Sequence, residues 1–423
     1  MVSLFSLIFG FSQVLLLFLH GDAATYWGDV EVLKQFKNGV NPGSVTPGSC
    51  LSSWDFSVDP CDNLSSEKFT CGFRCDVVVS SAARVTEVVL DRWGYSGSLA
   101  EISWNLPYLQ TLDLSGNFFH GEIPVSFVNL TRLRRLSLSR NLLSGWIPSS
   151  LGYIYNLEEI YLDNNKLEGA IPESFTGLAN LKTLALQDNE LTGEFPDLGE
   201  LNSVNFIDVS NNAISGELPA RFPANLIELT ARNNSITGNI PARISDLFYL
   251  QVLDLSHNNL SGAVPAPLFV HPALQQLTLS YNHYTSVEQP DPNLLQSSQL
   301  IAADLTNNEI RGFLPGFLGL LPRLSSLSLE NNKLSGIIPA QYALKVLVPG
   351  DGTTTSSQFE RLLLGGNYLI GAIPGPFLDL KPGSVTIRLG DNCLYRCPLR
   401  LFLCEGGEQK SLSECKAFGP IIP

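Results

Sequence analysis

A motif of about 24 residues recurs along most of the chain. Three consecutive copies can be written beneath one another: "LQTLDLSGNFFHGEIPVSFVNLTR", "LRRLSLSRNLLSGWIPSSLGYIYN" and "LEEIYLDNNKLEGAIPESFTGLAN". Further copies begin at Leu181, Val204, Leu226, Leu250, Leu274, Leu300, Leu324 and Phe359; a degenerate opening copy begins at Val85, and a closing copy holds Ile387, Leu389 and Asn392. One copy is too small to bury its own apolar face, whereas stacked copies bury a continuous one. The period therefore predicts a solenoid of about a dozen units.

The chemistry of one unit is readable from its residues. In Leu-x-x-Leu-x-Leu, the alternation predicts a short strand with apolar side chains inside and the x positions exposed. The asparagine after it can both donate and accept hydrogen bonds, so we expect it to join the turns of neighbouring units. The following Gly permits a tight bend, and Ile-Pro favours an extended segment. The recurring asparagines are Asn117, Asn141, Asn165, Asn189, Asn212, Asn234, Asn258, Asn282, Asn308, Asn332, Asn367 and Asn392.

The full phrase Leu-x-x-Leu-x-Leu-x-x-Asn-x-Leu-x-Gly-x-Ile-Pro resembles the plant-type extracellular leucine-rich repeat, over about residues 85–394. "WDFSVDPCDNLSSEKFTCGFRCD" resembles the N-terminal cap of plant leucine-rich-repeat receptors, although it has four cysteines where two are common, and "NCLYRCPLRLFLC" resembles the C-terminal cap. Residues 29–38 place Val32, Leu33 and Phe36 at helical spacing and predict a short helix. The resemblance implies an α/β repeat: a right-handed curved solenoid with a parallel sheet on its concave side and often a second small sheet.

The ends of the chain point to an oxidising compartment. Residues 4–19 are apolar and small residues follow, which predicts a signal peptide at 1–23. We expect an N-terminal cap at 24–84, the solenoid at 85–394 and a C-terminal cap at 395–423, with no later membrane span. Clusters of four cysteines indicate disulfides, and their spacing disfavours zinc. Each cluster leaves three pairings open. The cysteines are Cys50, Cys61, Cys71, Cys75, Cys393, Cys397, Cys404 and Cys415.

Several classes of function are disfavoured. The net charge of −14 argues against a nucleic-acid partner, which needs clustered cations. The chain lacks the sequence signatures of serine hydrolases, P-loop enzymes, zinc proteases and kinases, so we expect no catalytic residue, no metal and no cofactor. Asp113, Asp208, Asp254 and Asp304 share one position of different units, which favours a structural role over a catalytic pair.

Binding at the concave face has a better basis, because exposed strand positions form a broad, pre-ordered surface. One candidate patch sets a basic row beside an acidic one, and a second has aromatic side chains beside a cation. Alternatively, the charged rows simply pair with each other across adjacent strands. The first patch comprises Arg134, Arg135, Arg140, Glu158, Glu159, Tyr161, Asp163, Lys182, Gln187 and Asp188, and the second Arg232, His257, Tyr281 and Tyr284.

Glycosylation and two breaks in the period complete the expectations. Four Asn-x-Ser/Thr sequons occur, of which Asn129 is expected toward the convex side and Asn233 beside the concave face. The others are Asn63 and Asn259. Units 274–299 and 324–358 are longer than the rest. We expect the first to keep its strand and to replace its outer turn with a rim loop at 285–299 that is tolerated or contacts a secondary partner. A tolerated loop is favoured for the second.

We therefore expect a secreted recognition protein of the plant cell wall or apoplast, which binds a peptide or protein in receptor signalling. A membrane receptor kinase and a wall enzyme are the larger partners considered. One alternative is an inhibitor of a wall-degrading enzyme, similar to polygalacturonase inhibitors. Another is an anchorless receptor relative with a mainly structural role.

Overall fold

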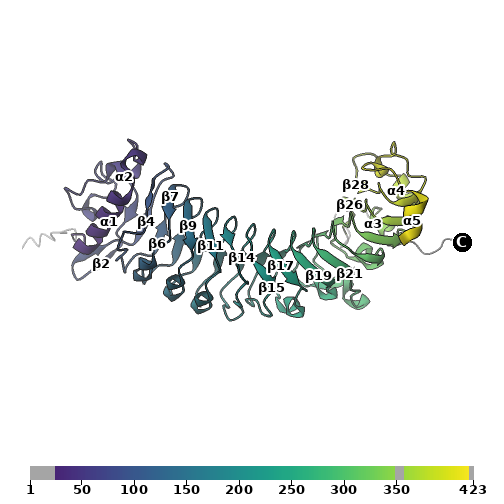
Figure 1. The fold of residues 1–423 in the computed structure, drawn as a ribbon, viewed down its shortest axis with the longest axis horizontal. Coiled ribbons are helices and arrows are strands. Elements are labelled where there is room, and N and C mark those ends of the chain that lie inside the picture. Colours follow the sequence, from purple (N-terminus) through teal and green to yellow (C-terminus); the bar gives the residue numbers. More distant parts are fainter. Residues whose placement is uncertain (1–23, 348–356, 419–423) are drawn as a thin grey trace, which may run out of the picture.

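The computed structural model describes residues 24–347 and 357–418, so the predicted signal peptide and most of the loop in unit 324–358 lie outside the described residues. The chain forms an arched array of stacked repeats between two caps (Figure 1). One 14-stranded sheet runs through the array, and all its pairings are parallel except that of β1 with β4. Its strands are β1 (Phe73–Arg74), β4 (Glu87–Val89), β6 (Thr111–Asp113), β8 (Arg135–Ser137), β10 (Glu159–Tyr161), β12 (Thr183–Ala185), β14 (Phe206–Asp208), β16 (Glu228–Thr230), β18 (Val252–Asp254), β20 (Gln276–Thr278), β22 (Ala302–Asp304), β24 (Ser326–Ser328), β26 (Arg361–Leu363) and β28 (Thr386–Arg388).

Three smaller sheets flank the main one, built from the segments that carry Leu-x-Gly-x-Ile-Pro. The first holds β5 (Ser96–Ser98), β7 (Phe118–Gly121), β9 (Leu142–Trp146), β11 (Lys166–Gly169) and β13 (Glu190–Leu191). The second holds β15 (Ser215–Glu217), β17 (Ser235–Gly238), β19 (Asn259–Val264) and β21 (His283–Val287), and the third β23 (Arg311–Phe313), β25 (Lys333–Gly336), β27 (Tyr368–Ala372) and β29 (Cys393–Tyr395).

Short helices return the chain from one strand of the main sheet to the next along the convex side (Figure 1). They begin after the Pro of most units because a fixed φ suits the start of a helix. They are η3 (Val125–Asn129), η4 (Ser149–Tyr153), η5 (Glu173–Gly177), η6 (Ala242–Asp246), η7 (Ala266–Val270), η8 (Pro292–Ser297), η9 (Gly316–Leu320), α3 (Ala340–Lys345) and α4 (Gly375–Leu378).

The core is the column of aliphatic side chains that the repeat phrase predicts. Leu112, Leu136 and Ile160 lie opposite one another in adjacent strands and are fully buried. Burial of such a side chain stabilises the fold by about 1.5–3 kcal/mol, so each unit depends on its neighbours for most of its stability.

The predicted asparagine ladder is present. The Asn165 amide donates to the carbonyls of Leu138 and Leu162, at 3.0 and 3.1 Å, while its oxygen accepts the N–H of Leu143 at 3.0 Å. The other ladder asparagines bond the turns of adjacent units in the same way, for example Asn332. Each bond contributes about 1 kcal/mol.

The recurring aspartates have the structural role that their shared position favours. In each case the carboxylate accepts the backbone N–H two residues ahead, which closes the turn after the strand. The distances are 3.0 Å from Asp113 to Ser115, 2.9 Å from Asp208 to Ser210, 2.9 Å from Asp254 to Ser256 and 3.0 Å from Asp304 to Thr306.

The long unit 274–299 differs from expectation in its outer part. Its strand β20 stays in register with β18 and β22, as expected. The predicted rim loop instead forms strand β21 and helix η8, where the Asp291 carboxylate accepts the N–H of Asn293 at 2.9 Å. One of the two extra residues is Thr285, which bulges out of the β19–β21 pairing. The break in the sequence phrase is therefore absorbed by a bulge and a capped helix.

The N-terminal cap covers the first repeat with helix α1 (Trp27–Gly39), which buries Val32, Leu33 and Phe36 as predicted. The fully buried carboxylate of Asp29 accepts two hydrogen bonds from the Arg84 guanidinium, at 2.8 and 2.9 Å. The cap also contains η1 (Pro42–Ser44), α2 (Cys50–Ser53), η2 (Cys61–Asn63), β2 (Val77–Val79) and β3 (Ala82–Arg84). The cysteines pair as Cys50–Cys71 and Cys61–Cys75.

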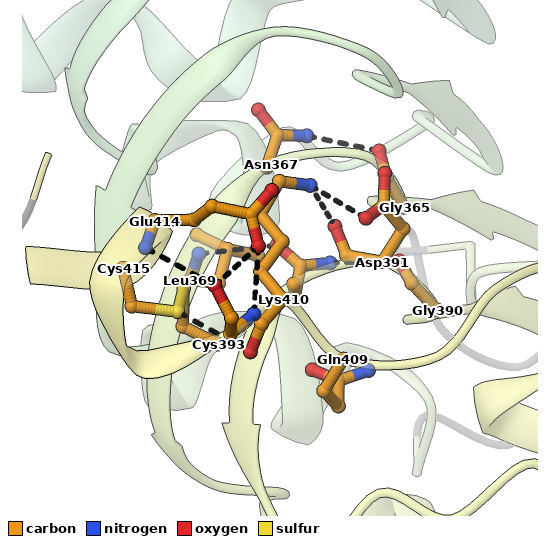
Figure 2. Close-up of polar contacts among 12 residues, drawn as sticks. Gly365, Asn367, Leu369, Gly390, Asp391, Cys393, Gln409, Lys410, Glu414 and Cys415 are labelled. Atoms are coloured by element: carbon orange, nitrogen blue, oxygen red, sulfur yellow. Dashed lines mark hydrogen bonds and ion pairs between the residues drawn. A yellow bond between two sulfur atoms is a disulfide. The ribbon is translucent and has the colours of Figure 1, made fainter. Parts of the chain in front are cut away.

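The C-terminal cap holds η10 (Phe402–Cys404), α5 (Leu412–Phe418) and the disulfides Cys393–Cys415 and Cys397–Cys404. It closes the ladder with a glutamine. The oxygen of Gln409 accepts the N–H of Leu394 at 2.8 Å, and its amide donates to the carbonyl of Leu389 at 3.2 Å. These are the two groups that a further ladder asparagine would bond. Figure 2 shows Gln409 and Lys410 beside the last turns, where Lys410 Nζ lies 2.8 Å from an Asp391 carboxylate oxygen.

Candidate functional site

The charged rows of the first patch pair with each other, as the alternative interpretation held. Glu158 contacts Arg134 and lies 2.6 Å from Lys182 Nζ, and both cations, Lys182 first, lower the pKa of its carboxyl. Arg135 pairs with Glu159, and its guanidinium lies 4.5 Å from the centre of the Tyr161 ring. The patch is thus a pre-ordered network across β8, β10 and the start of β12, and a ligand must compete with these pairs.

Two members of the first patch face the scaffold more than solvent. Asp163 is only 8% exposed and accepts hydrogen bonds from the Ser139 hydroxyl and, at 3.0 Å, from the amide of Asn164. Gln187 is half-buried, and its buried oxygen has no partner within residues 24–347 and 357–418. These two residues therefore offer less to a ligand than the sequence suggests.

The prediction of the second patch is wrong for one residue. His257 and Tyr281 are stacked, with ring centres 4.1 Å apart and planes 13° apart, and Arg232 is exposed beside their row. Tyr284, however, is fully buried and does not belong to this surface. The reason is its position: it lies two residues after ladder residue Asn282, where every unit directs an apolar side chain into the core. The sequence analysis predicted that Tyr284 is exposed because its aromatic side chain ends in a polar hydroxyl.

The residue just before each ladder asparagine adopts a left-handed backbone, with φ between 53° and 70° in all twelve units from 109 onward. Nine of them carry Asn, Asp or Gly, the residues that tolerate this conformation. The exceptions are Arg140, His257 and Tyr281. A left-handed backbone costs other residues about 1–2 kcal/mol. The local backbone conformation therefore disfavours the residue types found at these three positions.

A polar hollow of about 320 Å³ opens on the concave face over the first four units. Three arginines line it: Arg92, Arg135 and Arg140. The remaining lining residues are Asp113, Ser115, Gly116, Ser137, Ser139, Tyr161 and Asp163. Sequence reasoning left out Arg92 because it lies in the degenerate opening unit. Alignment of that unit by its leucines would have placed Arg92 in the same row as Arg140.

Two carboxyl groups lie partly buried elsewhere on the concave face. Burial raises the pKa of the Glu228 carboxyl, and the neighbouring Asp208 adds to the effect. Burial also raises the pKa of Glu330, an effect that Arg388 and Arg361 oppose. Toward the C-terminal end, the face therefore carries a carboxyl group near two arginines, in contrast to the arginine-lined hollow at the other end.

The four sequons lie at different parts of the surface. Asn129 ends the convex helix η3 and is exposed, as expected, and Asn233 is exposed next to the second patch. The amide of Asn63 donates to the carbonyl of Asp59 at 2.8 Å, and Asn259 lies exposed at the start of β19. Glycans at these residues stay a prediction.

Within the described ranges, no helix has the length and apolar character needed to cross a membrane.

Known proteins share these repeats. Models described as leucine-rich repeats match residues 108–130, 132–154, 155–214, 249–269 and 323–342. A probable leucine-rich repeat receptor-like serine/threonine-protein kinase of Arabidopsis thaliana is 38% identical over 90 residues, 19% of this chain and 9% of that protein. Receptor like protein 28 from the same plant is 36% identical over 94 residues, 22% of this chain and 11% of that protein. The matches thus span about a tenth of the length of these curated relatives.

A solved structure covers more of the array. The plant peptide hormone receptor RGFR1, in complex with RGF2, is 30% identical with a TM-score of 0.67. The similarity covers 77% of this chain and 50% of that one.

Proposed function

Because the chain is a leucine-rich-repeat protein of the plant receptor type, we propose that it recognises an extracellular peptide or protein through the concave face of its main sheet. The observation that carries the proposal is the continuity of that face: one sheet of 14 strands presents ordered side chains from cap to cap. A rigid surface loses little conformational entropy on binding. The similarity to RGFR1, a peptide hormone receptor, supports a peptide as the class of ligand.

The proposed location is extracellular, as a receptor-like component of signalling at the plant cell wall. Four disulfides in the two caps support it, because such bonds persist in oxidising compartments. The ligand contacts proposed on this face are Arg134, Arg135, Glu158, Tyr161 and Lys182 in the first patch, with secondary roles for Asp163 and Gln187, and Arg232, His257 and Tyr281 in the second.

The experiment is capture followed by measurement. The immobilised full chain is incubated with extracellular fluid from plant tissue, and bound peptides and proteins are identified by mass spectrometry. The captured species is then prepared pure, and its affinity is measured for the parent chain and for two variants. The concave variant is Arg232→Ala combined with Tyr281→Ala, and the control is Thr176→Ala on the convex helix η5.

We expect the concave variant to weaken binding at least tenfold and the convex variant to leave it unchanged. The reverse pattern would overturn the proposal. Capture of a wall-degrading enzyme that loses activity on binding would instead establish the inhibitor function.

A further inference from the structure

The hollow over the first four units holds two arginines whose charges are not matched by a direct partner. Arg135 pairs with Glu159, and the carboxylates of Asp113 and Asp163 already accept hydrogen bonds from the protein. By contrast, the exposed guanidinium groups of Arg92 and Arg140 form no ion pair with any residue in 24–347 or 357–418. Two exposed cations on one wall of a polar hollow are available to a ligand.

The side chain of the first of these arginines, Arg92, packs against a glycine. Arg92 and Arg140 occupy the same row two units apart, which corresponds to about 10 Å along the sheet. Gly116 lies between them with φ +69°, and a Cβ there would come within 2.8 Å of Arg92 Cδ and 3.2 Å of its Nε. The Arg92 side chain therefore lies across Gly116. Asparagine is the commonest residue in this row, but its side chain would displace Arg92.

The second arginine, Arg140, has a backbone conformation that is unfavourable for this residue type. Arg140 has φ 55°, in the row where nine of twelve units carry Asn, Asp or Gly. It contributes no hydrogen bond or ion pair of its own side chain within the described chain. Stability therefore gives no reason for an arginine at this position, whereas a ligand contact does.

We propose that Arg92 and Arg140 form a clamp for an anionic group carried by the ligand, a carboxylate or a phosphate- or sulfate-type ester. The proposal rests on the recognition function proposed above and names the chemical class bound at one end of its face. Each guanidinium can donate two parallel hydrogen bonds to such a group, an arrangement that a neutral hydroxyl cannot accept. The hydroxyl of Ser115 and that of Ser137, which also line the hollow, are further donors.

The test uses three blocked tripeptides on the full chain: acetyl-Gly-X-Gly-amide with X as aspartate, phosphoserine or serine. Affinities are measured by titration calorimetry at low and high salt, with inorganic phosphate as a fourth probe. We expect the aspartate or phosphoserine peptide to bind, the serine peptide to fail, and added salt to weaken binding. Binding of the serine peptide with equal affinity would overturn the clamp, and so would phosphate binding that matches the phosphopeptide, because the site would then serve a free ion.

Three variants separate the clamp from folding. Arg140→Asn and Gly116→Asn introduce the residue that five other units carry in this row, and Arg92→Asn removes the other cation. We expect each to reduce anion affinity at least tenfold while the melting temperature stays the same or, for Arg140→Asn, rises. Arg243→Asn, which removes an exposed arginine from convex helix η6, is the matched control and should change nothing.

Unchanged anion affinity in Arg140→Asn would overturn the clamp. This failure is distinguishable from a failure of the proposed function. If the natural ligand loses affinity with the Arg232 and Tyr281 variant but not with Arg140→Asn, concave recognition stands and the clamp falls.

Discussion

At the residue scale, we expect replacement of tyrosine by phenylalanine to have opposite effects on stability at two buried positions. Tyr284 and Tyr342 are both fully buried, but the Tyr342 hydroxyl donates to the carbonyl of Pro315 at 2.9 Å, whereas that of Tyr284 has no partner among the residues described. A buried hydroxyl without a partner costs stability. We expect Tyr284→Phe to raise the free energy of unfolding by about 1 kcal/mol and Tyr342→Phe to lower it by about 1 kcal/mol or more, as measured by denaturant unfolding.

The contrast between the two variants is the control, because both remove one oxygen from a buried ring. A loss of stability in Tyr284→Phe as large as in Tyr342→Phe would show that the Tyr284 hydroxyl bonds a buried water.

At the scale of elements, the C-terminal cap depends on a single side chain that imitates a repeat. Gln409→Ala would leave the N–H of Leu394 without its partner, and the carbonyl of Leu389 would keep only the amide of Asn392. We expect this to cost about 1–3 kcal/mol and to speed hydrogen exchange of the Leu394 amide. Glu408→Ala, at the exposed neighbouring residue, should have little effect on either. Equal exchange rates in the two variants would contradict the role of Gln409 in closing the ladder.

The convex turn after η7 carries a histidine that makes stability depend on pH. His271 is buried, and its Nδ1 accepts the N–H groups of Ala273 and Leu274 at 3.2 and 3.0 Å. Burial lowers the pKa of His271 from its ordinary value of 6.5, although the backbone of Leu247 opposes the change. Below pH 6.5 the unfolded chain therefore takes up a proton that the folded chain resists. The stability from neutral His271 is complete above that pH and is lost as the pH falls.

We expect the free energy of unfolding to fall on this account by at most about 1.4 kcal/mol per pH unit between pH 6.5 and 5. His271→Asn keeps a side-chain acceptor but does not titrate, so it should lack this component. The check is the difference between the two proteins in denaturant unfolding at pH 7.5 and at pH 5. A difference that is independent of pH would refute the prediction.

At the scale of the whole molecule, most of the fold was predictable because the repeat carries it. Spacing alone located the strands, the asparagine ladder and the aspartates that close the turns. The misjudged residues are those whose position in the repeat was overlooked or that lie outside the repeat pattern. Tyr284 was placed on the surface by its chemistry, Arg92 was missed in a degenerate unit, and Gln409 has no repeat pattern around it. The disulfide pairing could not be deduced from spacing, because three arrangements per cap satisfied it.

Because each unit of the stack contacts only its neighbours, we also expect the array to unfold locally. The Cys393–Cys415 disulfide closes a loop over 22 positions and ties the C-terminal cap to β29. We expect Cys393→Ala with Cys415→Ala to remove about 3 kcal/mol from the cap, so that hydrogen exchange accelerates in β28 and β26 while β14 and β16 keep their protection. Cys61→Ala with Cys75→Ala should give the mirror result, with faster exchange in β1 and β4 alone. Faster exchange throughout the array in either variant would mean that the solenoid unfolds as one cooperative unit and that the caps stabilise every repeat.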